Sequence, residues 1–329
     1  KRQVQTLALS LIETRGLSEM GFQARLMRKL EHEGELDREI EFLPDEADMA
    51  EREAQSIPLS RPELSVLLAY AKITLFDRLL GSKVPDDPYL ERDLMRYFPT
   101  RLQGKYPDEI RGHRLRREII ATMLANSMIN RGGASFINRI VDETGADEAA
   151  IATAYVLARD SFGFIDLNGE IDALDNKIPS EVQMELYLAV QDLVRQQTVW
   201  FLRNVTASGD LAQYVAHYSA GLTAIEKAFD KVLPEAALKG LEADQKALVA
   251  RKVPKEVAQK ITHLQHLSRA PDVILVAAQS KKPVEDVARV FYGLGASLNL
   301  DRIAAGAGAI PVVDYFERLA VNRTLESIF

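Results

Sequence analysis

The densest group of charged side chains that could do chemistry lies between residues 111 and 117. It consists of Arg111, His113, Arg114, Arg116 and Arg117. Guanidinium groups bind carboxylates and phosphates through paired hydrogen bonds, so this basic patch could hold an anionic ligand or an acidic partner surface. It could also form ordinary salt bridges near the start of a helix, to a neighbouring subunit or to another domain. We predict the salt-bridging role and keep anion binding as the alternative.

Two further patterns are compatible with metal binding but lack the necessary ligands. His263 and His266 share a helix face at a spacing that can chelate, yet no carboxylate or third histidine stands near them in the sequence. The segment Asp166–Glu170 is similar to the start of a calcium loop, but Ile171 occupies the position where that loop needs glycine. We therefore predict no metal site, packing or surface roles for the histidines, and a turn at residues 166–170.

No segment carries the pattern of a dinucleotide-binding or catalytic site. Binding of NAD usually needs a glycine-rich turn between a strand and a helix. Gly293–Gly295 and Ala304–Gly308 are rich in glycine, but no strand is predicted before them, and we interpret both as interhelical turns. Lys72 stands among apolar residues and is predicted to be snorkelling or ion-paired. The sequence thus predicts no catalytic residue and no cofactor-binding residue.

The elements that position these side chains are predicted to be helices, and the clearest of them begins after Ser60. Ser60, Pro62 and Glu63 form the pattern of a capping box with proline in the first turn. The helix that follows, residues 61–80, is apolar almost all round. It is therefore predicted to lie in the core.

A second strongly apolar helix is predicted over residues 113–131. Asn126 and Asn130 fall on the same face of this helix as Ile119 and Met123. Side-chain amides on a buried face need hydrogen-bond partners. We therefore predict a buried polar network around Asn126 and Asn130.

Helical periodicity continues along almost the whole chain, and no alternation of apolar and polar residues indicates strands. The fold class is therefore predicted to be all-α, an array of helical hairpins with little or no sheet. The further helices are expected over residues 1–14, 18–33, 45–55, 89–98, 135–144, 147–161, 180–203, 210–232, 235–249, 254–267, 272–279, 283–292 and 312–325.

The chain is predicted to contain two helical subdomains, residues 1–205 and residues 206–329, because Thr206–Gly209 is the best candidate linker. Shifting the sequence by 136 residues also places apolar positions of residues 134–165 over those of residues 270–301. This match predicts a repeated helix-turn-helix unit. Chance similarity between two amphipathic helix pairs is the alternative.

Composition argues against several kinds of partner. The formal net charge of −7 argues against nucleic acid. The chain has no cysteine, which removes disulfides and thiolate metal sites and is compatible with a reducing cytoplasm. No apolar run approaches the roughly 18 residues of a membrane helix, so we expect no membrane partner. Neither end carries a helix cap, a stop signal or a signal peptide, which suggests a segment of a larger polypeptide.

Four separated motifs resemble the C-terminal region of the large bacterial NAD-specific glutamate dehydrogenases. The resemblance extends, more loosely, from about residue 5 to the last residues. The motifs are RPELSVLLAYAKITLFDRLL, PDDPYLERDLMRYFP, HRLRREIIATMLANSMINRGGASFINRI and EIDALDNKIPSEVQMEL, and they occur in this order.

Members of this family are long cytoplasmic enzymes that oxidise L-glutamate to 2-oxoglutarate and ammonium with NAD, and their substrate lysine and dinucleotide fold lie upstream of the matched region. The resemblance therefore implies a non-catalytic helical C-terminal domain, with NAD bound elsewhere in the parent enzyme. The implied partners are the upstream dehydrogenase domain of the same polypeptide and further copies of the enzyme. The implied role is to pack against that domain, to restrain its opening and closing, or to build the oligomer.

Two other functions remain open. A regulatory module would bind an anionic effector at residues 111–117, and a small anion would then raise the melting temperature of the chain. A helical-repeat scaffold for another protein would need a continuous concave surface.

Overall fold

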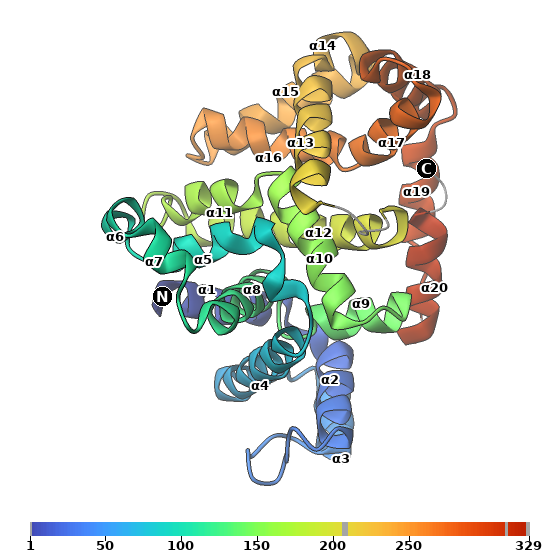
Figure 1. The fold of residues 1–329 in the computed structure, drawn as a ribbon. Coiled ribbons are helices and arrows are strands. Elements are labelled where there is room, and N and C mark those ends of the chain that lie inside the picture. The colour runs from blue at the N-terminus through green and yellow to red at the C-terminus, as the bar shows by residue number, and fades with distance from the viewer. Residues whose placement is uncertain (1, 206–209, 313–314, 327–329) are drawn as a thin grey trace. The chain divides into compact units, whose positions relative to one another are not determined.

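The computed structural model describes residues 2–205, 210–312 and 315–326, and within these residues it contains helices and no strand (Figure 1). The predicted all-α class is confirmed. No helix in this part of the chain is both long and apolar enough to span a membrane. The candidate linker Thr206–Gly209 lies outside the described residues.

The chain divides into two compact units that alternate along the sequence. The first unit comprises Lys1–Arg159 and Gln191–Ala212, and the second comprises Asp160–Val190 and Gln213–Phe329. Residues 160–190 thus group with the C-terminal part of the chain. The predicted division into folding subdomains at residue 205 stays a prediction.

The first unit is a series of short and medium-length helices. Its helix ends follow local signals: Asp147 accepts a hydrogen bond from the N–H of Ala150 at the start of α10, and Gly145 after α9 is left-handed. The elements are α1 (Arg2–Arg15), η1 (Gly16–Glu19), α2 (Met20–His32), α3 (Glu46–Gln55), α4 (Arg61–Leu80), η2 (Val84–Asp86), η3 (Pro88–Leu90), α5 (Glu91–Tyr97), α6 (Thr100–Lys105), α7 (Pro107–Arg111), α8 (Arg116–Gly132), α9 (Phe136–Thr144), nearly all of α10 (Glu148–Ser161) and the C-terminal part of α12 (Ser180–Asn204).

The second unit contains the remaining helices. They are α11 (Phe164–Asp172), the N-terminal part of α12, nearly all of α13 (Leu211–Lys227), α14 (Phe229–Val232), α15 (Glu235–Ala250), α16 (Lys255–Leu267), α17 (Ala270–Ser280), α18 (Val284–Ser297), α19 (Leu300–Gly308) and α20 (Tyr315–Glu326). Helices α13 and α17 approach closely at Gly221, where an added Cβ would lie 2.6 Å from the Ile274 side chain. Only glycine therefore fits there without a shift of the neighbouring side chain.

Three predicted turns are helical instead. Residues 166–170 lie inside α11, Gly293–Gly295 inside α18 and Ala304–Gly308 inside α19. A glycine inside a helix costs only about 1 kcal/mol relative to alanine, and the neighbouring residues at these places are good helix formers or pack against other helices. Glycine content alone was therefore an insufficient sign of a turn.

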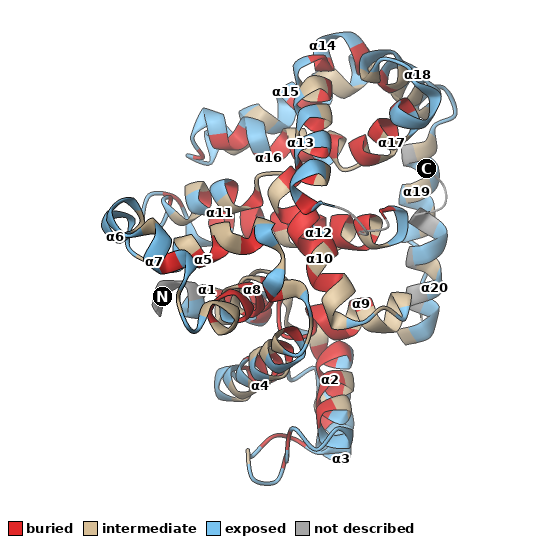
Figure 2. Ribbon diagram, in the orientation of Figure 1, coloured by how far each residue is buried: buried red, intermediate tan, exposed pale blue. Residues whose placement is uncertain are grey.

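Helix α4 packs lengthwise against α8 and forms much of the core of the first unit. Figure 2 shows buried residues along one side of α4 and exposed residues along the other. Helix α4 lies in the core as predicted, but only one of its two apolar faces is buried, because Ile73 on the second face is 54% exposed. The residues that α4 buries are Leu64, Leu67, Leu68, Ala71, Leu75 and Leu79, as expected for a stripe at helical spacing.

The start of α4 has the capping-box geometry that its sequence predicts. The Glu63 carboxylate accepts hydrogen bonds from the backbone N–H of Ser60 at 2.6 Å and from its hydroxyl at 2.7 Å. Arg52 of α3 donates two further bonds to Glu63, both 2.9 Å long. One carboxylate therefore closes the first turn of α4 and ties α3 to it.

Acidification is expected to weaken this cap. The pKa of Glu63 lies below its ordinary value of 4.5, because burial raises it and the hydrogen bonds from Arg52 and Ser60 lower it by more. A carboxylate with a lowered pKa in the folded state stabilises the fold above its unfolded-state pKa and loses that contribution as the pH falls through the folded value. Below pH 4.5 the free energy of unfolding, measured by urea denaturation, should fall more steeply for the unsubstituted chain than for Glu63→Gln. Identical pH profiles would contradict this expectation.

The helix boundaries of residues 134–165 and 270–301 correspond closely. Adding 136 to the bounds of α10 gives the bounds of α18, and adding it to the first residue of α11 gives the first residue of α19. Left-handed residues occur at equivalent places, Gly145 with Lys281 and Gly163 with Asn299. We propose on this basis that the two segments are copies of one helix-turn-helix unit.

Candidate functional site

The first residue of the predicted basic patch, Arg111, is occupied by local ion pairs. It donates from Nε to Glu91 at 2.7 Å and from Nη1 to Asp108 at 2.9 Å. The hydrogen bond to Glu91, followed by that to Asp108, raises the pKa of Arg111. This geometry is that of a solvent-exposed salt bridge between α7 and α5.

The other residues of the patch have separate environments. Arg117 donates to the carbonyl oxygens of Leu80 and Ser82 at 3.1 and 2.8 Å, and so holds the end of α4. His113 accepts from the N–H of Leu115 through Nδ1. Arg114 is exposed, and Nε of Arg116 is buried without a hydrogen-bond partner among the described residues. Anion binding at residues 111–117 stays a prediction.

The predicted buried network at Asn126 and Asn130 also stays a prediction. Both residues are half-buried on α8, and Oδ1 of Asn130 is buried with no hydrogen-bond partner in the described part of the chain. A hydrogen bond of 2.8 Å joins the hydroxyls of Ser127, also on α8, and Tyr155. This bond connects α8 to α10.

The predicted packing role of the two histidines agrees with their contacts. The rings of His263 and His266 lie edge-on to the ring of Phe229, with centroids 5.1 and 6.1 Å away. Nδ1 of His263 lies 2.7 Å from a carboxylate oxygen of Glu226. The described residues contain no group of three or more acidic or histidine side chains that could hold a metal.

Lys72 is half-buried on α4, where burial lowers its pKa. Burial is the one cause of this shift, and no acidic partner of Lys72 is present among the described residues. The Lys72 side chain therefore fits the snorkelling role, in which the apolar stem is buried and the ammonium group reaches solvent, and not the ion-paired role.

A buried ion pair lies between α5 and α10, and the sequence analysis missed it. Nη1 and Nη2 of Arg159 donate to the two carboxylate oxygens of Asp93, each at 2.9 Å. The side chains of Arg159 and Asp93 are only 3% and 5% exposed. This bidentate pair satisfies both charges in the core of the first unit.

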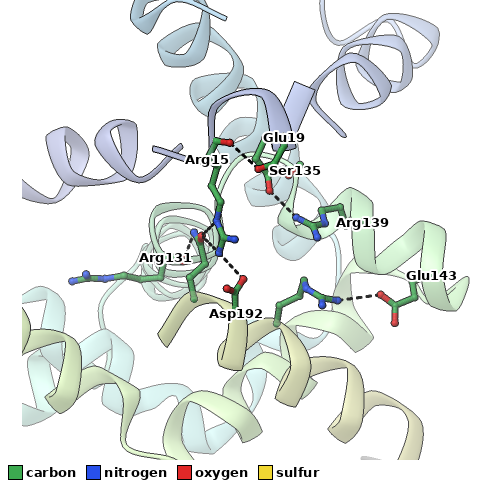
Figure 3. Close-up of polar contacts among 10 residues, drawn as sticks. Arg15, Glu19, Arg131, Ser135, Arg139, Glu143 and Asp192 are labelled. Atoms are coloured by element: carbon green, nitrogen blue, oxygen red, sulfur yellow. Dashed lines mark hydrogen bonds and ion pairs between the residues drawn. The ribbon is translucent and has the colours of Figure 1, made fainter. Parts of the chain in front are cut away.

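A second group of charges brings α1, η1, α9 and α12 together, and we call it the arginine cluster (Figure 3). Arg139 of α9 donates to Glu19 at 2.9 Å, and its guanidinium lies 3.8 Å from the centroid of the Phe22 ring. The other oxygen of Glu19 accepts from the Ser135 hydroxyl at 2.9 Å. Glu19 therefore holds both the start and the middle of α9.

Arg15 and α12 complete one side of the arginine cluster. Nη2 of Arg15 donates to Gln191 at 3.2 Å and to Asp192 at 2.5 Å. Gln191 in turn donates to the carbonyl oxygen of Arg131 at 3.0 Å. The side-chain amide of Gln191 therefore links α12 to the end of α1 and to the end of α8.

The opposite side of the cluster contains a buried carboxylate. Glu143 is only 3% exposed and accepts hydrogen bonds from Arg195 at 3.3 Å and Arg203 at 3.0 Å. Both arginines belong to α12, eight residues and therefore about two helical turns apart. Glu143 thus fixes α9 along the C-terminal part of α12.

A small cavity of about 20 Å³ lies inside the arginine cluster. Arg15, Arg139 and Arg195 line it together with Glu19 and Asp192. Burial lowers the pKa of Arg139; the charge of Glu19 raises it, and the nearby positive charges of Arg195 and Arg15 lower it further. Three guanidinium groups therefore converge on a space that could accept negative charge.

Sequence reasoning missed the arginine cluster because its residues are far apart in the chain. Arg15 and Asp192 are separated by 177 positions, and Glu19 and Arg139 by 120. The one local signal was the pair of glycines at the end of α8: Gly133 has φ = +94°, and a Cβ on Gly132 would lie 2.4 Å from Phe136. That turn brings Ser135 and Arg139 to Glu19.

Comparison with known proteins gives one family and several relatives. Residues 56–329 match the family described as "Glutamate dehydrogenase, C-terminal". The chain is 38% identical over 316 residues to an NAD-specific glutamate dehydrogenase of Halomonas elongata and 35% identical over 316 residues to one of Pseudomonas aeruginosa. It is 27% identical over 293 residues to one of Mycobacterium tuberculosis.

The matches cover most of this chain and a small part of each relative. The Halomonas and Pseudomonas matches include 96% of this chain and 20% of the relative, and the Mycobacterium match includes 87% and 17%. The chain therefore spans about a fifth of the length of the curated relatives that it matches.

Proposed function

This chain belongs to the glutamate dehydrogenase C-terminal family, and we propose that it is a non-catalytic helical module that packs against the remainder of a large NAD-specific glutamate dehydrogenase. The whole enzyme would convert L-glutamate, NAD and water to 2-oxoglutarate, ammonium and NADH in the cytoplasm. NAD would then bind outside the residues of this chain. The module would have a structural, interdomain or oligomer-building role.

The observation that carries this proposal is an uncovered apolar face on α18. Val290, Leu294 and Leu298 follow one another at a spacing of four residues and are 61%, 54% and 60% exposed. At the equivalent positions of α10, Ala154 and Ala158 are 3% and 0% exposed. The same position of the proposed repeat is thus covered in one copy and open in the other.

The opposite face of α18 already has its partners. Ala288 is fully buried, and the hydroxyl of Tyr292 donates to the carbonyl oxygen of His266 at 2.9 Å. Helix α18 packs through this side against α14 and α17. The face formed by Val290, Leu294 and Leu298 is therefore an additional surface, of the kind that marks an interaction site.

We assign the remainder of the dehydrogenase polypeptide as the occupant of this face. In the relatives, about four fifths of the polypeptide lies outside the matched region. A contact within one polypeptide has a high effective concentration, so even a small apolar face would stay occupied. A second copy of this chain is the competing occupant, and the experiment distinguishes the two.

The test is a binding measurement between two separately produced parts of the enzyme. The chain, mixed with the remainder of the dehydrogenase, is expected to form a complex in analytical ultracentrifugation. Leu294→Glu should weaken this complex at least about tenfold, because a buried leucine would be replaced by an unpaired charge. Arg289→Ala on the same helix is the matched control, since Arg289 is exposed and, within the described part of the chain, pairs with Asp286 of the same helix.

Two outcomes would contradict the proposal. Equal affinity of the Leu294→Glu and Arg289→Ala variants would exclude this face as the contact. Self-association of the chain that Leu294→Glu abolishes, with no binding to the remainder of the enzyme, would assign the face to a second copy.

A regulatory, effector-binding module remains the second candidate function. Its predicted site at residues 111–117 has less support, because Arg111 and Arg117 already use their donors on Glu91, Asp108, Leu80 and Ser82. The convergence of arginines elsewhere in the first unit favours a different place for an anion.

A further inference from the structure

We propose that the cavity of the arginine cluster binds a small oxyanion, a carboxylate or phosphate group, through Arg15, Arg139 and Arg195. The three residues lie on α1, α9 and α12, and all belong to the first unit. The site is separate from residues 111–117. It also does not depend on the proposed interface at α18.

The charge balance around the cavity favours an anion. Three guanidinium groups and two carboxylates line it, and with Arg203 and Glu143, which pair behind Arg195, the cluster has four guanidinium groups and three carboxylates. Asp192 is 62% exposed, so solvent screens much of its charge. An added negative group would offset the repulsion among Arg15, Arg139 and Arg195.

The guanidinium groups retain hydrogen-bond donors for a ligand. A guanidinium has five N–H groups. Among the described residues, Arg139 uses Nη1 for Glu19 and Arg195 uses Nη1 for Glu143. Arg15 uses Nε and Nη2 for Gln191 and Asp192. Each arginine can therefore still donate to an oxygen atom in the cavity.

An independent observation comes from Gln23, which also lines the cavity. Gln23 is only 3% exposed, and its Oε1 has no hydrogen-bond partner among the described residues. A buried polar atom without a partner is costly, and rotation of the carboxamide by about 180° would present the NH₂ donors at the same place. An oxyanion in the cavity would give Gln23 the missing partner.

The size of the cavity limits the ligand. A volume of about 20 Å³ is enough for one water-sized group. One oxygen of a carboxylate or phosphate can enter it, while the rest of the molecule lies toward solvent. The cavity is far smaller than the roughly 300–1,000 Å³ of a pocket for a whole cofactor.

The test is calorimetric titration of the 329-residue chain with inorganic phosphate and, separately, with acetate. Sodium chloride keeps the ionic strength constant in both titrations. We expect one of the two anions to bind at one site per chain. Binding of phosphate would identify the ligand class as phosphates, and binding of acetate would identify it as carboxylates. At saturation the melting temperature should rise by roughly 3 °C, because the ligand binds only the folded state.

Three variants make the result specific. Arg139→Gln should weaken binding by about 10- to 100-fold, as expected for one lost charge-assisted hydrogen bond. Arg195→Lys keeps the positive charge and loses the planar donor pair, so it should also weaken binding even if Arg139→Gln fails to fold. Arg111→Gln, in the exposed patch, should leave the affinity unchanged.

The proposal is overturned by either of two results. If neither phosphate nor acetate binds or raises the melting temperature, the cavity holds water only. If Arg111→Gln reduces the affinity as much as the cluster variants, the oxyanion binds at residues 111–117 instead.

Discussion

Replacing Asp93 with alanine should lower the free energy of unfolding of the chain by about 3–5 kcal/mol. The substitution removes the carboxylate that balances the charge of the Arg159 guanidinium, whose side chain is 3% exposed in the core of the first unit. Both hydrogen bonds of the pair, each 2.9 Å long, are lost at once. The measurement is urea denaturation followed by circular dichroism.

The control for this experiment is Asp108→Ala. Asp108 also pairs with an arginine, Arg111, but its side chain is 88% exposed. Exposed pairs contribute at most about 1 kcal/mol, so the control should unfold close to the unsubstituted chain. Equal losses for Asp93→Ala and Asp108→Ala would show that burial of the Asp93 pair does not determine its contribution.

A double variant separates the charge from the packing. Asp93→Leu combined with Arg159→Met removes both charges and fills the space with apolar atoms. Buried ion pairs replaced in this way are often neutral or stabilising. The double variant should therefore be more stable than Asp93→Ala, and a lower stability would contradict the explanation.

The second large effect is expected at Phe136, the first residue of α9. Its ring is 1% exposed and lies edge-on to the ring of Tyr155, with centroids 5.9 Å apart. Phe136→Ala should cost about 3–5 kcal/mol through lost burial and the cavity that remains. Urea denaturation measures this loss as well.

Gly132 provides a matched test of the same contact. An added Cβ on Gly132 would lie 2.4 Å from Phe136, so Gly132→Ala should destabilise the unsubstituted chain. In the Phe136→Ala background the ring is absent but the Cβ of residue 136 remains, 2.8 Å from the added Cβ, so Gly132→Ala should cost less than in the unsubstituted chain without becoming neutral. Additive effects of the two substitutions would rule out a direct clash.

These substitutions also bear on the role of the module. Phe136 follows the turn that places Ser135 and Arg139 against Glu19, and Asp93 with Arg159 fixes α10 against α5. Both features stabilise the helical framework on which the arginine cluster depends. A loss of anion binding in Phe136→Ala without unfolding would be consistent with this framework role.

Local sequence was sufficient to predict the helical class and many helix ends. Ser60 with Glu63, Asp147 and Gly145 act within one turn of their own helix, so their effect can be predicted without knowledge of the fold. The four motifs of the first 186 residues likewise indicated the family, which the match over residues 56–329 supports. Local patterns overestimated the burial of α4, since its second apolar face at Ile73 is open in this structure.

The charged partners could not be predicted in the same way. Arg111 belongs to the densest basic patch of the sequence, yet it forms exposed ion pairs with nearby residues. Arg139 and Arg159 have no such pattern around them, and they form ion pairs that join separate helices in the structure. The difference depends on which carboxylate each arginine meets and on how much water remains around the pair.

The sequence by itself thus determined the helices, their caps and the family of this protein. Only the tertiary structure decided which arginines converge on the cavity between α1, α9 and α12, and which apolar face of α18 stays open. Helix caps depend on bonds between neighbouring residues. Ion pairs such as Glu19 with Arg139, 120 positions apart, exist only after packing has brought distant helices together and removed the water between them.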